Sequence, residues 1–138
     1  MTVIAFRDGV MAADTCAVWF GDLKDMGCHK IMRAGKKLIA CAGIGCPSDA
    51  AALKWYKEGM PPWPEMNFVM LIAAKKGLKL ATTLGGFDLV KAEYFAIGAG
   101  AQCAMGAMYM GASAEEAVQA AIKHIDGCAG DVDVESLR

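Results

Sequence analysis

The chain has 138 residues, of which 56% are hydrophobic, and a formal net charge of −1. This length is typical of one domain, which can bury roughly two-thirds of its unfolded surface without disulfides or metals. The near-neutral charge excludes the basic surface that would bind nucleic acid or an anionic membrane. We therefore expect one domain over residues 1–138, and its high apolar content suggests buried contacts with partner chains.

The first half of the chain is predicted to consist mainly of strands joined by tight turns. The predicted strands cover residues 2–6, 10–13, 30–33 and 37–42. The Asp8–Gly9 dipeptide favours a hairpin turn because glycine adopts positive φ without a steric penalty. Residues 16–27 have both strand-like and turn-like character, so both structures stay open. A helix is predicted from Ser48, a candidate N-cap, to Gly59 ahead of a proline-rich loop.

The second half combines further strands with two helices. The predicted strands cover residues 68–74, 78–82, 87–90 and 132–134, and residues 94–97 lead into the Gly98–Ala99–Gly100 segment. One helix is predicted over residues 102–110. Another follows Ser113, which forms a capping box with Glu116, and ends near Asp126. Because hairpins come first and these helices are grouped together, the sequence predicts an α+β fold with helices packed on antiparallel sheets.

The stretch from residue 94 to residue 114 carries no charge and is long enough to cross a bilayer. It consists mostly of Ala, Gly and Met, which insert into membranes less readily than Leu, Ile and Phe. We therefore expect a tightly packed interior helix here and no membrane association.

The six cysteines form no CxxC pair and have no regular spacing. The chain also begins without a signal-peptide pattern, so we expect reduced thiols in a cytoplasmic protein. A zinc site is an alternative, although its spacing matches no established ligand pattern; its ligands would be Cys28, His29, Cys41 and Cys46. We expect no metal and no cofactor.

Thr2 is the first candidate for chemistry. Initiator methionine is commonly removed before a small residue, and removal of Met1 would leave a free α-amine beside the Thr2 hydroxyl. An α-amine has an ordinary pKa of about 7.7–8, which suits a general base. A threonine activated by its own amine is an established nucleophile. Alternatively, Thr2 is an ordinary strand residue, since many proteins begin with Met-Thr.

Segments spread over most of the chain resemble, in order, the proteasome β-subunit and HslV-like family of N-terminal threonine peptidases. They read TVIAFRDGVMAAD, HKIMRAGKKLIACAGIG, YFAIGAGAQCAMGAM and AGDVDVESL. The resemblance implies a four-layer αββα sandwich of the N-terminal-nucleophile (Ntn) hydrolase type. It also implies cleavage of peptides or unfolded proteins inside a homo-oligomeric ring, fed by an unfolding ATPase.

By the same resemblance, Thr2 matches the catalytic threonine, Asp14 the aspartate closing the second strand, and Lys30 the active-site lysine. A lysine ammonium near the hydroxyl would favour its deprotonation, and Asp14 could orient that lysine. Gly43 matches the glycine whose backbone N–H holds the oxyanion, and one such donor contributes about 3 kcal/mol. Considered singly, Asp14 could merely cap a turn and Lys30 could be a solvated surface residue.

The chain departs from the family pattern at several places. Ala99 stands where the family often has a serine near the catalytic threonine. Asp126 matches a family aspartate, but Ala129 replaces a second serine. The region between Gly45 and residue 68 has room for one short helix instead of two long ones that take part in ring contacts. We therefore predict a reduced middle helical region.

The predicted function is an endopeptidase that forms an acyl-enzyme on Thr2 after removal of Met1. Two alternatives stay open. The first is a catalytically inactive ring or scaffold subunit, which the replaced serines favour. The second is a non-proteolytic Ntn amidase that acts on a small amide.

Overall fold

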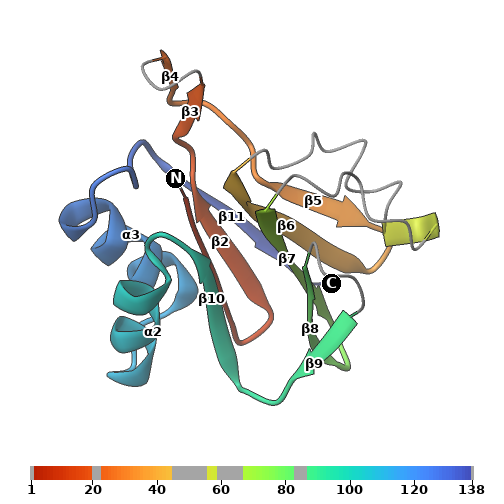
Figure 1. The fold of residues 1–138 in the computed structure, drawn as a ribbon. Helices are drawn as coiled ribbons and strands as arrows, with labels where there is room; N and C mark the ends of the chain where they lie inside the picture. Colours follow the sequence, from red (N-terminus) through yellow and green to blue (C-terminus); the bar gives the residue numbers. More distant parts are fainter. Residues whose placement is uncertain (1, 20–22, 45–55, 59–66, 83–86, 138) are drawn as a thin grey trace.

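The computed structural model describes residues 2–19, 23–44, 56–58, 67–82 and 87–137 (Figure 1). Within this part of the chain, two antiparallel sheets lie face to face. The first has the strand order β10-β1-β2-β11, made of β10 (Tyr94–Gly98), β1 (Val3–Arg7), β2 (Val10–Asp14) and β11 (Val132–Ser136). The second has the order β5-β6-β7-β8-β9, made of β5 (Ile31–Ala34), β6 (Lys37–Ile44), β7 (Asn67–Ala74), β8 (Gly77–Thr82) and β9 (Phe87–Val90).

Two helices cover the outer face of the first sheet, as Figure 1 shows at its left. They are α2 (Ala101–Tyr109) and α3 (Ala114–His124). The chain is therefore α+β, with a helix layer followed by two sheet layers.

Strand β1 contributes to a core on each of its faces, because successive side chains of a strand point to opposite sides. Val3 and Ala5 pack with the helices. Ile4 and Phe6 pack between the two sheets. All four residues are buried, so the strand that begins next to Thr2 is fixed from both sides.

A third apolar cluster lies on the outer face of the second sheet, where Ile39, Met70 and Ile72 pack together. Tyr56 packs against this cluster, accepts a hydrogen bond from Lys37 Nζ, and has that Nζ 5.1 Å from its ring centroid. Residues 56–58 are helical and match the last turn of the predicted 48–59 helix. Residues 48–55 and 59 of that prediction lie outside the described part of the chain.

The sequence predictions of strands and of the two later helices are confirmed to within a few residues. The capping box is present: Ser113 N donates to Glu116 Oε2 at 2.8 Å, and Glu116 N donates to Ser113 Oγ at 3.1 Å. The ambiguous residues 16–27 contain a small hairpin, β3 (Ala17–Trp19) and β4 (Leu23–Asp25). The last strand extends to Ser136, since β11 pairs with the whole of β2.

One prediction is wrong in its extent. Residues 94–114 do not form one interior helix, because residues 94–98 pair with β1 as strand β10. In α2 only Ala104 and Met108 are fully buried, while Tyr109 and Met110 are exposed at its end. No helix in the described part of the chain is long and apolar enough to cross a membrane.

A substitution at Gly106 tests whether this part of α2 is exposed. It lies inside α2, and a Cβ added to it would have no atom within 4 Å. Alanine loses less conformational freedom than glycine when a helix forms. We therefore expect Gly106→Ala to raise the free energy of unfolding by about 0.5–1 kcal/mol, measured by urea denaturation. A loss of stability would show that the space beside Gly106 is occupied.

Candidate active site

Thr2 is held where β10 ends and the chain turns into α2. Its carbonyl oxygen accepts a hydrogen bond from Gly100 N at 3.2 Å. Gly98 has a φ of +95°, and a Cβ on it would lie only 2.3 Å from Thr2 O. A side chain at Gly98 would therefore displace Thr2, so the close approach of the two strands depends on this glycine.

Asp14 ends β2 and is fully buried. Its Oδ1 accepts hydrogen bonds from Thr2 Oγ1 at 2.8 Å and from Val3 N at 3.0 Å. Lys30 Nζ also donates to Oδ1, at 2.7 Å, while Ala129 N donates to Oδ2 at 3.2 Å. A buried charge is tolerated only when it is paired and hydrogen-bonded. Both oxygens meet this condition, so the carboxylate is fixed in one orientation.

Lys30 approaches from the other sheet. It directly precedes β5, whose first residue Ile31 lies opposite Ala40 of β6. Its ammonium donates to Thr2 Oγ1 as well as to Asp14, and its side chain is only 9% exposed. Three side chains from separate parts of the sequence therefore meet at one hydroxyl oxygen.

This arrangement has clear chemical capabilities. A buried ammonium in contact with Thr2 Oγ1 would stabilise negative charge that develops on that oxygen, and burial strengthens the interaction. Asp14 balances the ammonium and fixes its direction. The arrangement is therefore suited to a nucleophilic hydroxyl.

Gly43 lies in β6, opposite Phe68 of β7, and has a φ of +136°. It is exposed. Since Ile31 lies opposite Ala40, Gly43 is further along β6 toward the end of the sheet at which Lys30 enters. Its predicted role as an oxyanion donor stays a prediction.

The remaining predicted positions contribute differently. Ala99 is exposed in the turn between β10 and α2, and its methyl group has no hydrogen-bonding capacity. Asp126 is exposed in the turn after α3, so the carboxylate that reaches Thr2 is that of Asp14. Ala129 lacks the family hydroxyl, but its backbone N–H holds Asp14 Oδ2.

Sequence reasoning missed the backbone amides of Val3 and Ala129 as partners of Asp14. No residue type signals such an amide, because every residue except proline carries one. The glycines around Ala99 were a usable signal, since a close backbone approach often requires glycine.

The zinc alternative finds no support among the described residues. None of the His, Cys, Asp and Glu side chains in this part of the chain form a group of three or more that could hold a metal ion. His29 is exposed and pairs with Asp133, with 3.1 Å between Nδ1 and Oδ2. The proposed ligand Cys46 lies outside the described residues.

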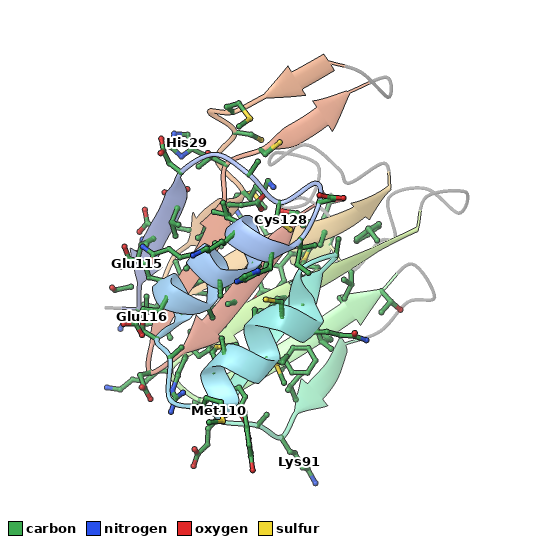
Figure 2. All side chains as sticks on the ribbon, turned by 90° about the vertical axis from the view of Figure 1, so that its left-hand side faces the viewer. His29, Lys91, Met110, Glu115, Glu116 and Cys128 are labelled. Carbon is green, nitrogen blue, oxygen red and sulfur yellow. The ribbon has the colours of Figure 1, made fainter. Side chains whose placement is uncertain are left out.

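Cys128 lies just after α3, beside the upper end of that helix in Figure 2. Burial raises the pKa of its thiol to about 11, and the nearby Asp14 carboxylate adds to this increase. The thiolate is thus disfavoured in the folded protein. A raised thiol pKa contributes stability below the unfolded pKa, and this contribution is lost as pH rises toward the folded value.

We therefore expect Cys128→Ala to flatten the pH dependence of stability between about pH 9 and about pH 11. In that window the wild type should lose up to about 1.4 kcal/mol of unfolding free energy per pH unit from this thiol alone. Urea denaturation of both proteins at stepped pH measures the difference. If the unfolding free energies of the two proteins changed equally with pH, the raised pKa would not belong to Cys128.

No protein-family model and no curated protein sequence matches the chain, whereas solved structures do. Thiobacillus denitrificans BPH in complex with epoxomicin matches with 22% identity and a TM-score of 0.68, covering 99% of this chain and 98% of that one. A second structure, of Thiobacillus denitrificans BPH, matches with 21% identity, a TM-score of 0.69 and the same coverage. Eukaryotic HslV from Trypanosoma brucei matches with 14% identity and a TM-score of 0.72, covering 97% of each chain. The chain therefore has a proteasome-like fold, in agreement with its sequence segments.

Proposed function

We propose that this chain is an N-terminal threonine peptidase, contained in one domain over residues 1–138, whose nucleophile is Thr2 after removal of Met1. The observation that carries this proposal is the contact of the Thr2 hydroxyl with the fully buried Asp14 and with Lys30, whose side chain is 9% exposed. An ordinary strand threonine needs neither a buried carboxylate nor a buried ammonium on its hydroxyl.

In the proposed acylation step, the free α-amine of Thr2 takes the proton from Oγ1. The oxygen then bonds to the carbonyl carbon of the substrate. Lys30 stabilises the negative charge on Oγ1, and Gly43 N–H is the proposed donor to the carbonyl oxygen. When the C–N bond breaks, the α-ammonium returns its proton to the leaving amine.

Deacylation reverses these roles. Water gives a proton to the α-amine and attacks the ester carbon. The ester bond then breaks, the carboxylic acid product leaves, and Thr2 Oγ1 regains the proton. The α-amine thus acts as base and acid in turn, and each cycle returns it to its starting state.

Epoxomicin, the molecule named in the BPH complex, suits the test because an epoxyketone can react with both the hydroxyl and the amine of an N-terminal threonine. We expect intact mass to show loss of Met1 and one added epoxomicin per chain. Thr2→Ala should lose Met1 and gain nothing. Retained Met1, or lost Met1 without an adduct, would overturn the proposal and favour the inactive ring subunit, which Ala99 and Ala129 support.

A second assay identifies the substrate class. We expect hydrolysis of unfolded casein and of fluorogenic peptides by the Met1-free protein. An adduct with epoxomicin together with hydrolysis of small amides alone would instead indicate the amidase.

We further propose a fourth, helical layer on the face of the second sheet where Tyr56 packs, and assembly of several copies into a ring. Light scattering after size-exclusion chromatography would test the assembly, since a monomer mass would contradict it. An unfolding ATPase partner stays a prediction from the resemblance, and a cytoplasmic location stays a prediction from the cysteine pattern.

A further inference from the structure

Thr15 directly follows Asp14 and is 7% exposed, and each of its polar groups is hydrogen-bonded. Its backbone N–H donates to Asp131 O at 3.1 Å, and its carbonyl oxygen accepts from Cys28 N at 2.9 Å. Its Oγ1 donates to Met26 O at 2.5 Å and accepts from Asp131 N at 2.9 Å. The hydroxyl therefore acts as donor and acceptor at once.

The two segments joined by this hydroxyl both lead to the candidate site. Met26 follows the β3–β4 hairpin, and the chain continues from it to Lys30. Asp131 comes two residues after Ala129, whose N–H holds Asp14. Figure 2 shows His29 and Cys128, neighbours of these segments, in the upper half of the molecule. Thr15 thus lies where three segments carrying the site come together.

Gly130 shows how tightly this junction is packed. Its φ is +85°, and a Cβ on it would lie 2.4 Å from Thr15 Oγ1 and 3.2 Å from Met26 O. The backbone at Gly130 therefore leaves no room for a side chain beside the hydroxyl. A valine at position 15 would fit the space of threonine but leave Met26 O and Asp131 N without this partner, and unpaired buried polar groups are unfavourable.

We propose that Thr15 is a positioning residue: its hydroxyl sets the placement of Lys30 and of the Ala129 amide relative to Asp14. Its effect on catalysis rests on the proposed function, whereas its effect on the Ala129 amide does not. Thr15 itself has no direct contact with Thr2 among the hydrogen bonds described.

The test compares Thr15→Val with Thr15→Ser, which restores a hydroxyl. Ile39→Val is the matched control, because it loses a methyl group from the third apolar cluster, away from the site. For peptide hydrolysis we expect Thr15→Val to lower kcat by about tenfold to a hundredfold through misplacement of catalytic groups, with KM changed less than about twofold. Thr15→Ser should recover most of the loss, and Ile39→Val should keep the wild-type rate.

An independent readout is hydrogen exchange of the Ala129 amide, followed by NMR relative to the buried Leu71 amide of β7. We expect Thr15→Val to speed exchange at Ala129 by at least about tenfold relative to Leu71, and Thr15→Ser to restore it. Unchanged kcat and unchanged Ala129 exchange in Thr15→Val would overturn the proposal.

The two proposals can fail separately. If the wild type gains no epoxomicin adduct and cleaves no substrate, the proposed peptidase function is refuted. The hydrogen exchange of the Ala129 amide then tests the positioning role of Thr15 by itself. Faster exchange only in Thr15→Val supports the role of Thr15, and equal exchange in all variants refutes it. An active wild type whose Thr15→Val variant matches Ile39→Val in kcat refutes the catalytic part.

Discussion

Lys30→Met is expected to lower activity strongly and to weaken the fold at the same time. The ammonium of Lys30 contacts Thr2 Oγ1 and pairs with the fully buried Asp14 carboxylate. Removing one partner of a buried ion pair leaves an uncompensated charge and costs about 3–5 kcal/mol of unfolding free energy. Loss of the charge that stabilises the attacking oxygen should lower kcat by about a hundredfold to a thousandfold.

Urea denaturation and peptide hydrolysis measure the two effects of Lys30→Met. Lys79→Met is the matched control, since Lys79 is exposed on β8 and such surface changes usually alter stability by less than about 0.5 kcal/mol. If Lys30→Met kept wild-type kcat, the assignment of this lysine to the reaction would be wrong. If only stability fell, Lys30 would be a structural counter-ion of Asp14.

Gly98→Ala should give the second large effect. The added Cβ would overlap the backbone of Thr2, with 2.3 Å to the carbonyl oxygen, at a φ of +95°. The strained φ alone costs about 1–3 kcal/mol, and relief of the overlap must change the position of Thr2 relative to β10. We expect kcat to fall by about a hundredfold, because small misplacements of reacting groups have effects of this size.

Gly35→Ala separates these two causes. Gly35 also has a positive φ, +62°, but a Cβ on it would have nothing within 4 Å. The Gly35→Ala variant should therefore lose about 1–2 kcal/mol of unfolding free energy from backbone strain and keep the wild-type kcat. The epoxomicin modification rate provides a second readout for both variants. If Gly98→Ala and the wild type reacted with epoxomicin at equal rates, the added methyl group would not disturb the reactivity of Thr2.

Much of the fold could be predicted because local signals agreed with the final packing. The Asp8–Gly9 turn, the capping box at Ser113 and the alternation of apolar residues all act over a few residues. Residues 94–114 were harder to interpret, since their lack of charge suits a buried strand and a packed helix equally well. Pairing with β1, a segment distant in sequence, decided the strand.

The candidate site could likewise be predicted only in part. Thr2, Asp14 and Lys30 could be found from residue types placed in a familiar order, and the structure brings them together. The roles of Thr15 and of the Ala129 amide could not be found, because they depend on how the end of β2 meets residues 26–28 and 129–131. Such contacts arise from tertiary packing and leave no local pattern.

The antiparallel pairing of β1 with β2 also constrains how related chains can vary in length. Thr2 and Asp14 are 12 residues apart and lie at the open end of the same hairpin. The register places Asp14 one position beyond Ala13, which lies opposite Ile4, so Asp14 lies next to Val3 and within reach of the Thr2 hydroxyl. Losing or gaining one residue from each strand keeps this relative placement, whereas a single insertion or deletion shifts the pairing and turns side chains to the wrong face. Related chains that keep both residues should therefore separate them by an even number of positions, unless a β-bulge absorbs the odd residue.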